Sequence, residues 1–436
     1  MIRPARFCLL LPLLLAVTRA GAARGESGNS NNPPLPRQAP DALGVSSARL
    51  GRIAKVLEQD VAQGRMPGAV VAIARRGKLI YYESFGYLDK AAGTRMPKDA
   101  LFSIASMTKP LTGVATMILQ EEGRLHLSEP ASKYLPVLGR LRVATAPAVA
   151  TGKPAAPETV ALRVPISIQD LMRHTAGMAY GFSGTSPLNK LWPNTAADFA
   201  RDDDGPGFLA RLETLPLLHQ PASVWEYSVS NDVLGLLVEA VAGQGLAPFL
   251  AERLFRPLGM VDTGFIVPPD KVKRYARALP NDPETGRPQV VMDSTLPHKF
   301  DCGGACAVST AGDYLRFAQM LLDRGRLGNT RILGRKSVEL MTSDHLGREI
   351  ANPVLDQDPT RRGVGYGLTM SVRLHPGVSP FLGSEGEFGW GGAYGTQFWV
   401  DPKEQLVVIF MAHTPGSQRA HYRQLLTSLV LQAIVD

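Results

Sequence analysis

The sequence predicts a mixed α/β protein in which the two ends of the chain form one β-sheet and the middle is helical. Short β-prone segments lie at residues 69–75 and 79–85, and further ones lie between residues 366 and 411. Between these groups the apolar residues recur at helical spacing. With 436 residues, 44% of them hydrophobic, the chain is long enough to bury a large core without disulfides or a metal ion.

A helix is expected before the first β-prone segments. Ser47 is a suitable N-cap, and apolar residues follow it on one helix face as far as Gly64: Leu50, Ile53, Leu57 and Val61. The segments 69–75 and 79–85 then form a hairpin that turns around Arg76-Gly77-Lys78.

The remaining elements follow from the same patterns. A buried helix is expected at 106–120, and residues 141–165, rich in Ala, Pro, Thr and Val, are interpreted as a surface insertion. Further helices are predicted at 168–173, 233–243, 248–255, from a cap at 308–310 to residue 322, at 336–341 and at 418–435, and strands at 366–373, 388–391, 396–400 and 406–411. We therefore expect a single domain over residues 44–436, with a sheet region near 44–100 and 295–436 and a helical region near 101–294.

The first 23 residues differ from the rest. Arg3 and Arg6 precede an apolar run at 7–17, and small residues follow it. This pattern is typical of a secretory signal peptide cleaved after Ala22 or Ala23, so a secreted or periplasmic location is expected, with a mitochondrial presequence as the alternative. The run is too short to span a bilayer, so no stable membrane anchor is expected. Residues 24–43, rich in Gly, Ser, Asn and Pro, are expected to be a disordered lead-in.

Charge and cysteine content exclude several classes of protein. The formal charge is +8, and loss of residues 1–23, with three arginines and no acid, would leave +5. The basic residues are scattered, which argues against nucleic-acid binding. Cys302 and Cys306 remain after cleavage, and either a disulfide across Gly303-Gly304-Ala305 or two buried thiols fits. No Cys and His spacing resembles a zinc site, so no metal or cofactor is expected.

A serine and a lysine three residues apart provide the first catalytic signal. Ser106 and Lys109 lie one turn apart on the helix predicted at 106–120, so they share a face and can share a proton. No other lysine in the chain has a serine three positions before it. Such a pair makes a serine hydrolase without a catalytic histidine. Taken alone, however, the match also fits a solvated helix face.

Two further phrases complete a known arrangement. Tyr227-Ser228 precedes the helix predicted at 233–243, and Gly389-Trp390-Gly391-Gly392 lies at the strands near the C-terminus. Together with the serine and lysine pair they resemble the serine β-lactamase and penicillin-binding-protein family, in the branch of class C β-lactamases, D-alanyl-D-alanine carboxypeptidases and family VIII carboxylesterases. The resemblance covers about residues 45–436. It implies an antiparallel sheet flanked by helices beside an all-helical region.

The resemblance implies a role for each motif residue. Ser106 would be the nucleophile, with Lys109 and Tyr227 as the acid/base pair, because a phenol beside an ammonium can take the serine proton and pass it to the leaving group. Which of the two is the formal base stays open. The oxyanion would be held by the backbone amides of Ser106 and Ala393.

Other side chains are assigned to the substrate or to the core. Trp390, Gly391 and Gly392 are expected to bind the substrate, because the glycines leave room along the strand edge. Tyr180 and Phe182 are candidate pocket walls. Trp225 is a further candidate wall, although core packing is the favoured interpretation for it. No window reads Gly-x-Ser-x-Gly, which argues against a Ser, His and Asp triad, so these histidines are interpreted as structural: His174, His298 and His413.

Both polar groups that hold a β-lactam in this family are missing. Where penicillin-recognising members carry Lys-Thr-Gly, this chain has Trp390-Gly391-Gly392, and Val229 replaces an asparagine two places after the motif tyrosine. Asn231 and Asp232 are interpreted as a local cap of the next helix. An anionic substrate would be left with an unpaired carboxylate, whereas a neutral ester would lose little.

The sequence thus predicts a secreted serine hydrolase that cleaves small-molecule carboxylic esters through an acyl-enzyme on Ser106. Short-chain acyl esters are the expected substrates, and acyl transfer to an alcohol is open to the same intermediate. The alternatives are a β-lactamase or D-alanyl-D-alanine carboxypeptidase and, from another class, a non-catalytic penicillin-binding-like interaction protein. Retention of Ser106, Lys109 and Tyr227 argues against the last. The natural substrate and the oligomeric state are not predicted.

Overall fold

One antiparallel sheet of eight strands organises the computed structural model, which describes Met1 and residues 33–145, 157–194, 200–353 and 361–436. The predicted signal peptide and the first part of the predicted lead-in, residues 2–32, lie outside the described residues. The strand order is β10-β11-β12-β13-β14-β1-β2-β3. The strands are β1 (Gly68–Arg75), β2 (Lys78–Asp89), β3 (Thr94–Arg95), β10 (Val364–Tyr366), β11 (Ser371–Arg373), β12 (Phe388–Gly391), β13 (Gln397–Asp401) and β14 (Leu406–Ala412).

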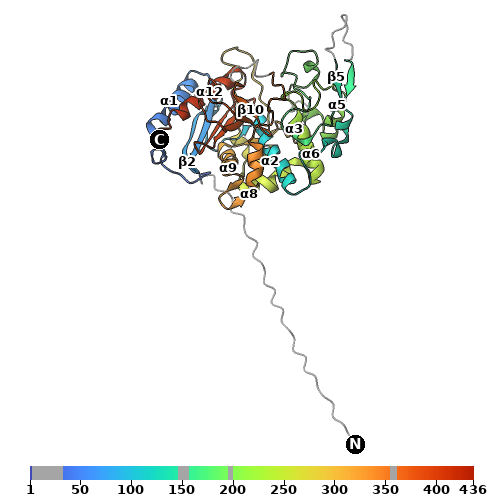
Figure 1. The fold of residues 1–436 in the computed structure, drawn as a ribbon. Coiled ribbons are helices and arrows are strands. Elements are labelled where there is room, and N and C mark those ends of the chain that lie inside the picture. The colour runs from blue at the N-terminus through green and yellow to red at the C-terminus, as the bar shows by residue number, and fades with distance from the viewer. Residues whose placement is uncertain (2–32, 146–156, 195–199, 354–360) are drawn as a thin grey trace. The chain divides into compact units, whose positions relative to one another are not determined.

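The sheet joins the two ends of the chain at β1 and β14. Their register runs from Ala69 opposite Ala412 to Arg75 opposite Leu406. This confirms the prediction of one sheet built from both ends, because β1 to β3 precede the helical region and β10 to β14 follow it (Figure 1). Three short strand pairs lie outside this sheet: β4 (Phe102–Ser103) with β7 (Val308–Ser309), β5 (Arg142–Ala144) with β6 (Thr159–Ala161), and β8 (Arg326–Leu327) with β9 (Thr330–Arg331).

Helices cover both faces of the sheet, so β1 is buried along its whole length. Its odd-numbered residues 69, 71 and 73 pack in the cluster with α1 (Ser47–Ala62) and α12 (Ser417–Leu431), which lie against each other (Figure 1). The even-numbered residues 70, 72 and 74 belong to the larger core, and α9 (Ala311–Leu322) packs on β1, β13 and β14. This alternation follows from the two-residue period of a strand.

The helical region packs around two helices that are buried on nearly every side. Residues 108–119 of α2 (Thr108–Glu121) and 230–238 of α6 (Ser230–Ala242) are buried, and the two helices contact each other. The other described helices are α3 (Ile168–Met172), α5 (Gly205–Glu213), α7 (Leu246–Leu250), α8 (Arg256–Leu258) and α10 (Arg335–Met341), with 3-10 turns η1 (Pro40–Leu43), η2 (Ala105–Met107), η3 (Ala131–Lys133), η4 (Pro136–Gly139), η5 (Asn189–Leu191) and η7 (Pro269–Arg274) and the π turn η6 (Ala251–Phe255).

No single helix of the described residues is long and apolar enough to cross a membrane. One bent pair, Ser230–Ala242 with Leu246–Leu258, passes the same test by length and composition only, with a bend of 76° at its break.

The predicted disorder of residues 24–43 is wrong for residues 33–43. Leu35 is buried, Gln38 N donates to Leu79 O at 3.1 Å, and Leu79 N donates to Pro36 O at 2.8 Å. The reason is that the backbone next to Leu79 offers hydrogen-bonding partners that this segment can satisfy, which its polar composition does not indicate.

Smaller differences concern element boundaries. Ser46, not Ser47, caps α1, because its hydroxyl accepts from Arg49 N at 3.3 Å. The strand predicted at 366–373 is instead two strands, β10 and β11, which pair around a turn that contains Thr369 at a φ of 73°. The insertion predicted at 141–165 contains the short pair of β5 and β6 on its described residues.

Candidate active site

The candidate nucleophile lies on a constrained turn between β4 and α2. Ala105, directly before Ser106, has a φ of 44°, in the left-handed region that residues other than glycine rarely adopt. Thr108 holds this turn, because its hydroxyl donates to Ala105 O at 2.7 Å and accepts from Ala307 N at 3.0 Å. Ser106 is partly exposed in η2, one 3-10 turn before α2 begins. Backbone strain of this kind is concentrated at functional sites.

Lys109 brings a fully buried amine to this serine. Its side chain has 0% exposure, and its Nζ lies 3.4 Å from Ser106 Oγ. The same Nζ donates to Gly304 O at 2.8 Å and lies 3.4 Å from the Tyr180 hydroxyl. The pair recognised in the sequence is therefore in hydrogen-bonding reach, with the amine fixed by a backbone carbonyl from a distant segment.

Asp232 is a member of the cluster that the sequence motifs did not indicate. Its carboxylate is fully buried and accepts from Gly304 N at 2.7 Å and from the Tyr180 hydroxyl at 3.3 Å. Burial raises the pKa of Asp232 to about 6, although the Lys109 ammonium and the Gly304 amide act in the opposite direction. A buried carboxylate beside a buried amine is an arrangement typical of functional sites.

The prediction that Asn231 and Asp232 cap a helix is therefore wrong. Helix α6 begins at Ser230 without a side-chain cap, and Asn231 donates to Leu171 O at 2.9 Å. An acidic residue near a helix start ordinarily caps it, so the local sequence indicates that role. Asp232 instead accepts a hydrogen bond from the backbone of Gly304, which is distant in the sequence.

A disulfide joins Cys302 to Cys306, with Cα atoms 5.2 Å apart, and resolves the two alternatives left by the sequence. The loop that it closes, residues 302–306, faces the catalytic cluster. Gly304 contacts both charged groups, Lys109 through its carbonyl and Asp232 through its amide. Gly303 O accepts from the Thr112 hydroxyl at 2.7 Å. A Cβ at Gly304 would overlap the Asp232 carboxylate, so this close approach requires glycine.

Removing the disulfide is expected to lower both stability and activity. The variant Cys302→Ser with Cys306→Ser should unfold with a free energy about 2 kcal/mol smaller, because the bridge closes a short loop. It should also lose about 10- to 100-fold in kcat with a small change in KM, because the Gly304 carbonyl that holds Lys109 becomes mobile. Urea unfolding and ester kinetics with and without reductant measure both effects. A fall in stability alone would show that the loop does not position Lys109.

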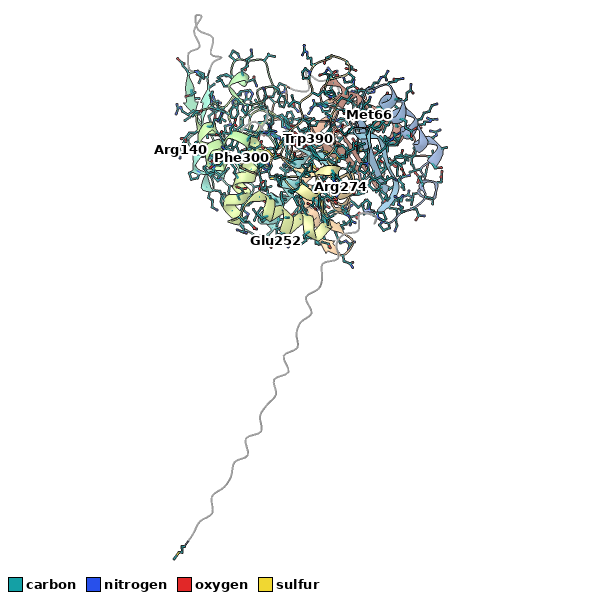
Figure 2. The ribbon with its side chains drawn as sticks, turned by 180° about the vertical axis from the view of Figure 1, so that it is seen from behind. Met66, Arg140, Glu252, Arg274, Phe300 and Trp390 are labelled. Carbon is teal, nitrogen blue, oxygen red and sulfur yellow. A yellow bond between two sulfur atoms is a disulfide. The ribbon has the colours of Figure 1, made fainter. Side chains whose placement is uncertain are left out.

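Tyr227 and Trp390 close the site from two other elements. The Lys109 Nζ lies 4.7 Å from the centroid of the Tyr227 ring, and Trp390 Nε1 donates to the Tyr227 hydroxyl at 3.2 Å. In the view of Figure 2, Trp390 lies between Phe300 of the helical region and Met66 beside the sheet. The three sequence motifs are thus brought together from α2, from the segment before α6 and from β12.

The candidate oxyanion hole has one open amide on its strand side. Gly392 N donates to Thr396 O, and Gly395 N donates to Gly392 O. Between them Ala393 is partly exposed, and the described residues provide no acceptor for its amide. The two glycines also serve packing, because a Cβ at Gly391 would overlap Arg423 and one at Gly392 would overlap Ile104 O.

Tyr180 is buried behind the candidate nucleophile and does not line an open substrate pocket, contrary to the prediction from the sequence. It is 3% exposed and contacts Lys109 and Asp232, so it belongs to the polar network behind the serine. Phe182 stacks on its ring with centroids 5.2 Å apart and is 60% exposed, which leaves Phe182 available to a ligand at the surface.

The histidines are held in structural roles. His174 is fully buried at a φ of 60°, its Nδ1 lies 3.2 Å from Ser228 Oγ, and burial together with the Lys109 charge lowers its pKa well below the usual value. His413 Nδ1 lies 3.1 Å from Ala276 O, and His298 Nε2 lies 3.1 Å from an Asp301 oxygen. Trp225 is 3% exposed in a cluster with Leu346, Ile350 and Tyr366.

A serine and lysine pair with a tyrosine beside it, between an antiparallel sheet and a helical region, defines a serine hydrolase of the penicillin-recognising type. The chain belongs to the Beta-lactamase family, whose model matches residues 53–432.

The chain is also similar to individual known proteins, among them esterases. Protein Rv1367c of Mycobacterium tuberculosis is 38% identical over 358 residues, which are 81% of this chain and 87% of that protein. Esterase EstB of Burkholderia gladioli is 29% identical over 398 residues, 86% of this chain and 93% of EstB. The solved structure of EstCE1, described as a hydrolase with promiscuous acyltransferase activity, has a TM-score of 0.71 and 27% identity and covers 88% of this chain and 98% of EstCE1. The chain is thus similar to esterase-type members of the family.

Proposed function

We propose that this protein is a carboxylesterase that forms an acyl-enzyme on Ser106. The observation that carries the proposal is the 3.4 Å contact of Lys109 Nζ with Ser106 Oγ, in a buried cluster that also contains Tyr227 and Asp232. The similarity to EstB and to the Lovastatin esterase of Penicillium rubens, 28% identical over 365 residues, supports the ester substrate class.

The reaction follows from the roles of these groups. Lys109 and Tyr227 take the Ser106 proton as the oxygen attacks the ester carbonyl carbon, and the amides of Ser106 and Ala393 bind the oxyanion that forms. When the tetrahedral intermediate collapses, the carbon–oxygen bond to the alcohol breaks, and the same pair returns the proton to the leaving alcohol. A water molecule repeats these steps on the acyl-enzyme and releases the acid. An alcohol in place of water would give acyl transfer.

The substrate preference is proposed from what replaces the polar groups of β-lactam-binding relatives. Trp390 offers an apolar wall beside the Tyr227 hydroxyl, and Val229 is fully buried where the family carries an asparagine. An ester needs neither of the missing hydrogen bonds, whereas a β-lactam would leave polar groups unpaired.

Secretion to an oxidising compartment belongs to the same proposal. It is supported by the basic and apolar pattern of residues 1–23 and by the Cys302–Cys306 disulfide, since such bonds persist outside the cytosol.

A substrate comparison tests the proposed activity. Short-chain p-nitrophenyl esters should be hydrolysed with a kcat/KM at least about 100-fold above that for a chromogenic cephalosporin. A fluorophosphonate should label the protein, and Ser106→Ala should be neither active nor labelled. Faster turnover of the cephalosporin would favour a β-lactamase instead. Absence of both turnover and labelling would favour the non-catalytic binding protein.

A further inference from the structure

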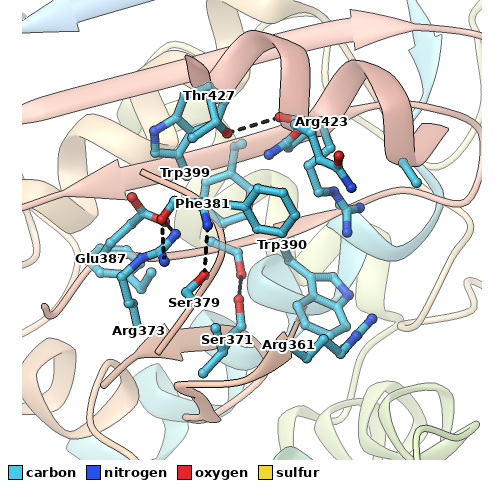
Figure 3. A pocket seen from close by; sticks show the side chains of 18 of the residues that line it. Arg361, Ser371, Arg373, Ser379, Phe381, Glu387, Trp390, Trp399, Arg423 and Thr427 are labelled. Carbon is cyan, nitrogen blue, oxygen red and sulfur yellow. Dashed lines mark hydrogen bonds and ion pairs between the residues drawn. The ribbon is translucent and has the colours of Figure 1, made fainter. Parts of the chain in front are cut away.

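A cavity of about 250 Å³ opens beside the candidate active site, on the Trp390 side. Its described walls come from β10, β11, β12 and β13, from the segment 379–387 and from α12. Trp390 lines the cavity from the side on which Arg361 also lies (Figure 3). Trp390 Nε1 also donates to the Tyr227 hydroxyl, so the Trp390 side chain lies between the cavity and Tyr227.

The cavity is strongly basic. Of the described residues that line it, four are arginines and one, Glu387, is acidic. Glu387 is already paired with Arg373 at 3.0 Å, on the side of the cavity away from Trp390 (Figure 3). Of the other three arginines, Arg361 and Arg423 lie on the Trp390 side, and Arg419 comes from the same helix as Arg423 (Figure 3).

Two of these three arginines are held by contacts with β12, which forms part of the cavity wall. The Arg361 guanidinium lies 5.7 Å from the centroid of the Trp390 ring, a cation–π contact. The Arg423 guanidinium lies against Gly391 so closely that a Cβ at that position would overlap it. The glycine that replaces the family's threonine thus makes room for a cation that comes from α12.

Arg419 differs from its two neighbours. It is accessible from the cavity, yet among the described residues it forms no hydrogen bond or ion pair. Burial lowers the pKa of its guanidinium, the Tyr227 phenol acts in the opposite direction, and the Arg361 charge lowers it further. Arg419 is exposed and lines the same cavity as Arg361, and the two like charges, with no acid paired to Arg419 among the described residues, favour an anion that enters the cavity from solvent.

The position of the cavity relative to Tyr227 indicates which part of a substrate would reach Arg419. Tyr227 is the group that returns a proton to the departing alcohol, so the alcohol portion of the ester lies next to its hydroxyl. Trp390 is the neighbour of Tyr227 that also lines the cavity, and Arg419 lines the same cavity. A substituent on the alcohol portion would extend past Trp390 into the cavity.

We infer that the cavity is an anion subsite and that the preferred substrates are esters whose alcohol portion carries a carboxylate, bound by Arg419 with Arg361 and Arg423 beside it. This inference rests on the proposed esterase function and narrows it. The prediction that an anionic substrate would keep an unpaired carboxylate took account only of residues 229 and 390–392. The cations come instead from residue 361 and from α12.

The inference is tested with two acetate esters of which one carries a carboxylate on the alcohol side and the other carries that group as its methyl ester: 4-acetoxybenzoate and methyl 4-acetoxybenzoate. The wild-type protein is expected to favour the anionic ester in kcat/KM, mainly through KM. In Arg419→Gln the anionic ester should lose about 10- to 100-fold more than the neutral one, as for a lost hydrogen bond to a charged group. Arg419→Lys should restore part of the preference.

A control variant excludes a general effect of charge, and the comparison of the two esters distinguishes binding of the substrate carboxylate by Arg419 from an effect on Tyr227. Arg256→Gln removes a charge from α8, outside the cavity, and should leave the ratio between the two esters unchanged. Equal losses for both esters in Arg419→Gln would overturn the inference, because Arg419 would then act on Tyr227 rather than on the substrate. Hydrolysis of the neutral ester with no charge preference in any variant would overturn it as well.

Failure of the proposed function has a different signature. If neither ester is hydrolysed, binding of 4-acetoxybenzoate to Ser106→Ala, measured by calorimetry, still tests the subsite. Binding that is lost in Ser106→Ala with Arg419→Gln supports the anion subsite, and binding of equal strength in both overturns it.

Discussion

Substitution of Lys109 by methionine is expected to lower kcat for ester hydrolysis by about 10³-fold, within the range measured for groups that transfer a proton in the transition state. Methionine matches the length of the side chain but cannot exchange a proton with Ser106, 3.4 Å away, or with Tyr227. The effect should be on kcat, with KM changed much less, because the amine is fully buried behind the serine. Steady-state kinetics with p-nitrophenyl acetate measure both constants.

Two further lysine variants isolate the cause of that loss. Lys109→Arg keeps the positive charge, yet it should be as inactive as the methionine variant, because a guanidinium does not lose its proton in a protein. Lys55→Met, on the exposed face of α1, should have wild-type kinetics. An active Lys109→Arg variant would refute the role of Lys109 in proton transfer and leave it a purely electrostatic one.

Asp232→Asn should separate activity from stability in a way that depends on pH. The folded-state pKa of Asp232 is raised from 3.8 to about 6, so the folded protein binds the proton more tightly than the unfolded chain. The stabilising contribution is therefore full below pH 4 and is lost as the pH rises through 6. By linkage, the wild type should lose about 2 to 3 kcal/mol of unfolding free energy relative to Asp232→Asn between pH 4 and 7.5.

The same variant should lose about 10- to 100-fold in kcat at pH 7.5, because an amide cannot balance the Lys109 charge. Asp313 offers a matched control, since burial also raises its pKa to about 6 while it contacts Asp262 and Thr263, outside the catalytic cluster. Asp313→Asn should show the same kind of pH-dependent gain in stability with wild-type kcat. Urea unfolding at several pH values, with kinetics at each, distinguishes the two carboxylates. Equal kcat in both variants would exclude a role for Asp232 in the reaction.

The architecture was predictable because it follows from the period of the apolar residues and from the order of the helical and β-prone segments along the chain. The two-residue period near both ends and the helical spacing between them predict one sheet with a helical middle, and the observed join of β1 with β14 agrees. Errors arose where a local pattern was compatible with two structures. Residues 33–43 have a polar composition typical of a disordered segment, yet they form hydrogen bonds with the backbone of Leu79. Residues 366–373 are β-prone throughout, but a turn at Thr369 divides them.

In the candidate site too, the local contacts were predictable from the sequence and the long-range contacts were not. Ser106 and Lys109 are one helical turn apart, so their contact is a local property that the sequence spacing predicts. Asp232 and Gly304 act on Lys109 from segments more than a hundred residues away from it in the chain. One available signal was the pair of glycines enclosed by two cysteines, because glycine permits a close approach of the backbone to a neighbour such as the Asp232 carboxylate.

The amino-acid sequence by itself identified the candidate nucleophile with its candidate amine and tyrosine partners, predicted the β-lactamase-type architecture, and showed that the residues which hold a β-lactam in this family are replaced. These are properties of spacing and of residue identity within short phrases. Only the tertiary structure decided what surrounds them: the carboxylate of Asp232, the disulfide loop that fixes Lys109, and the basic cavity at Arg419. The physical reason is that the charge and the shape of a site depend on all the residues that surround it in space. Folding brings these residues together from separate parts of the chain.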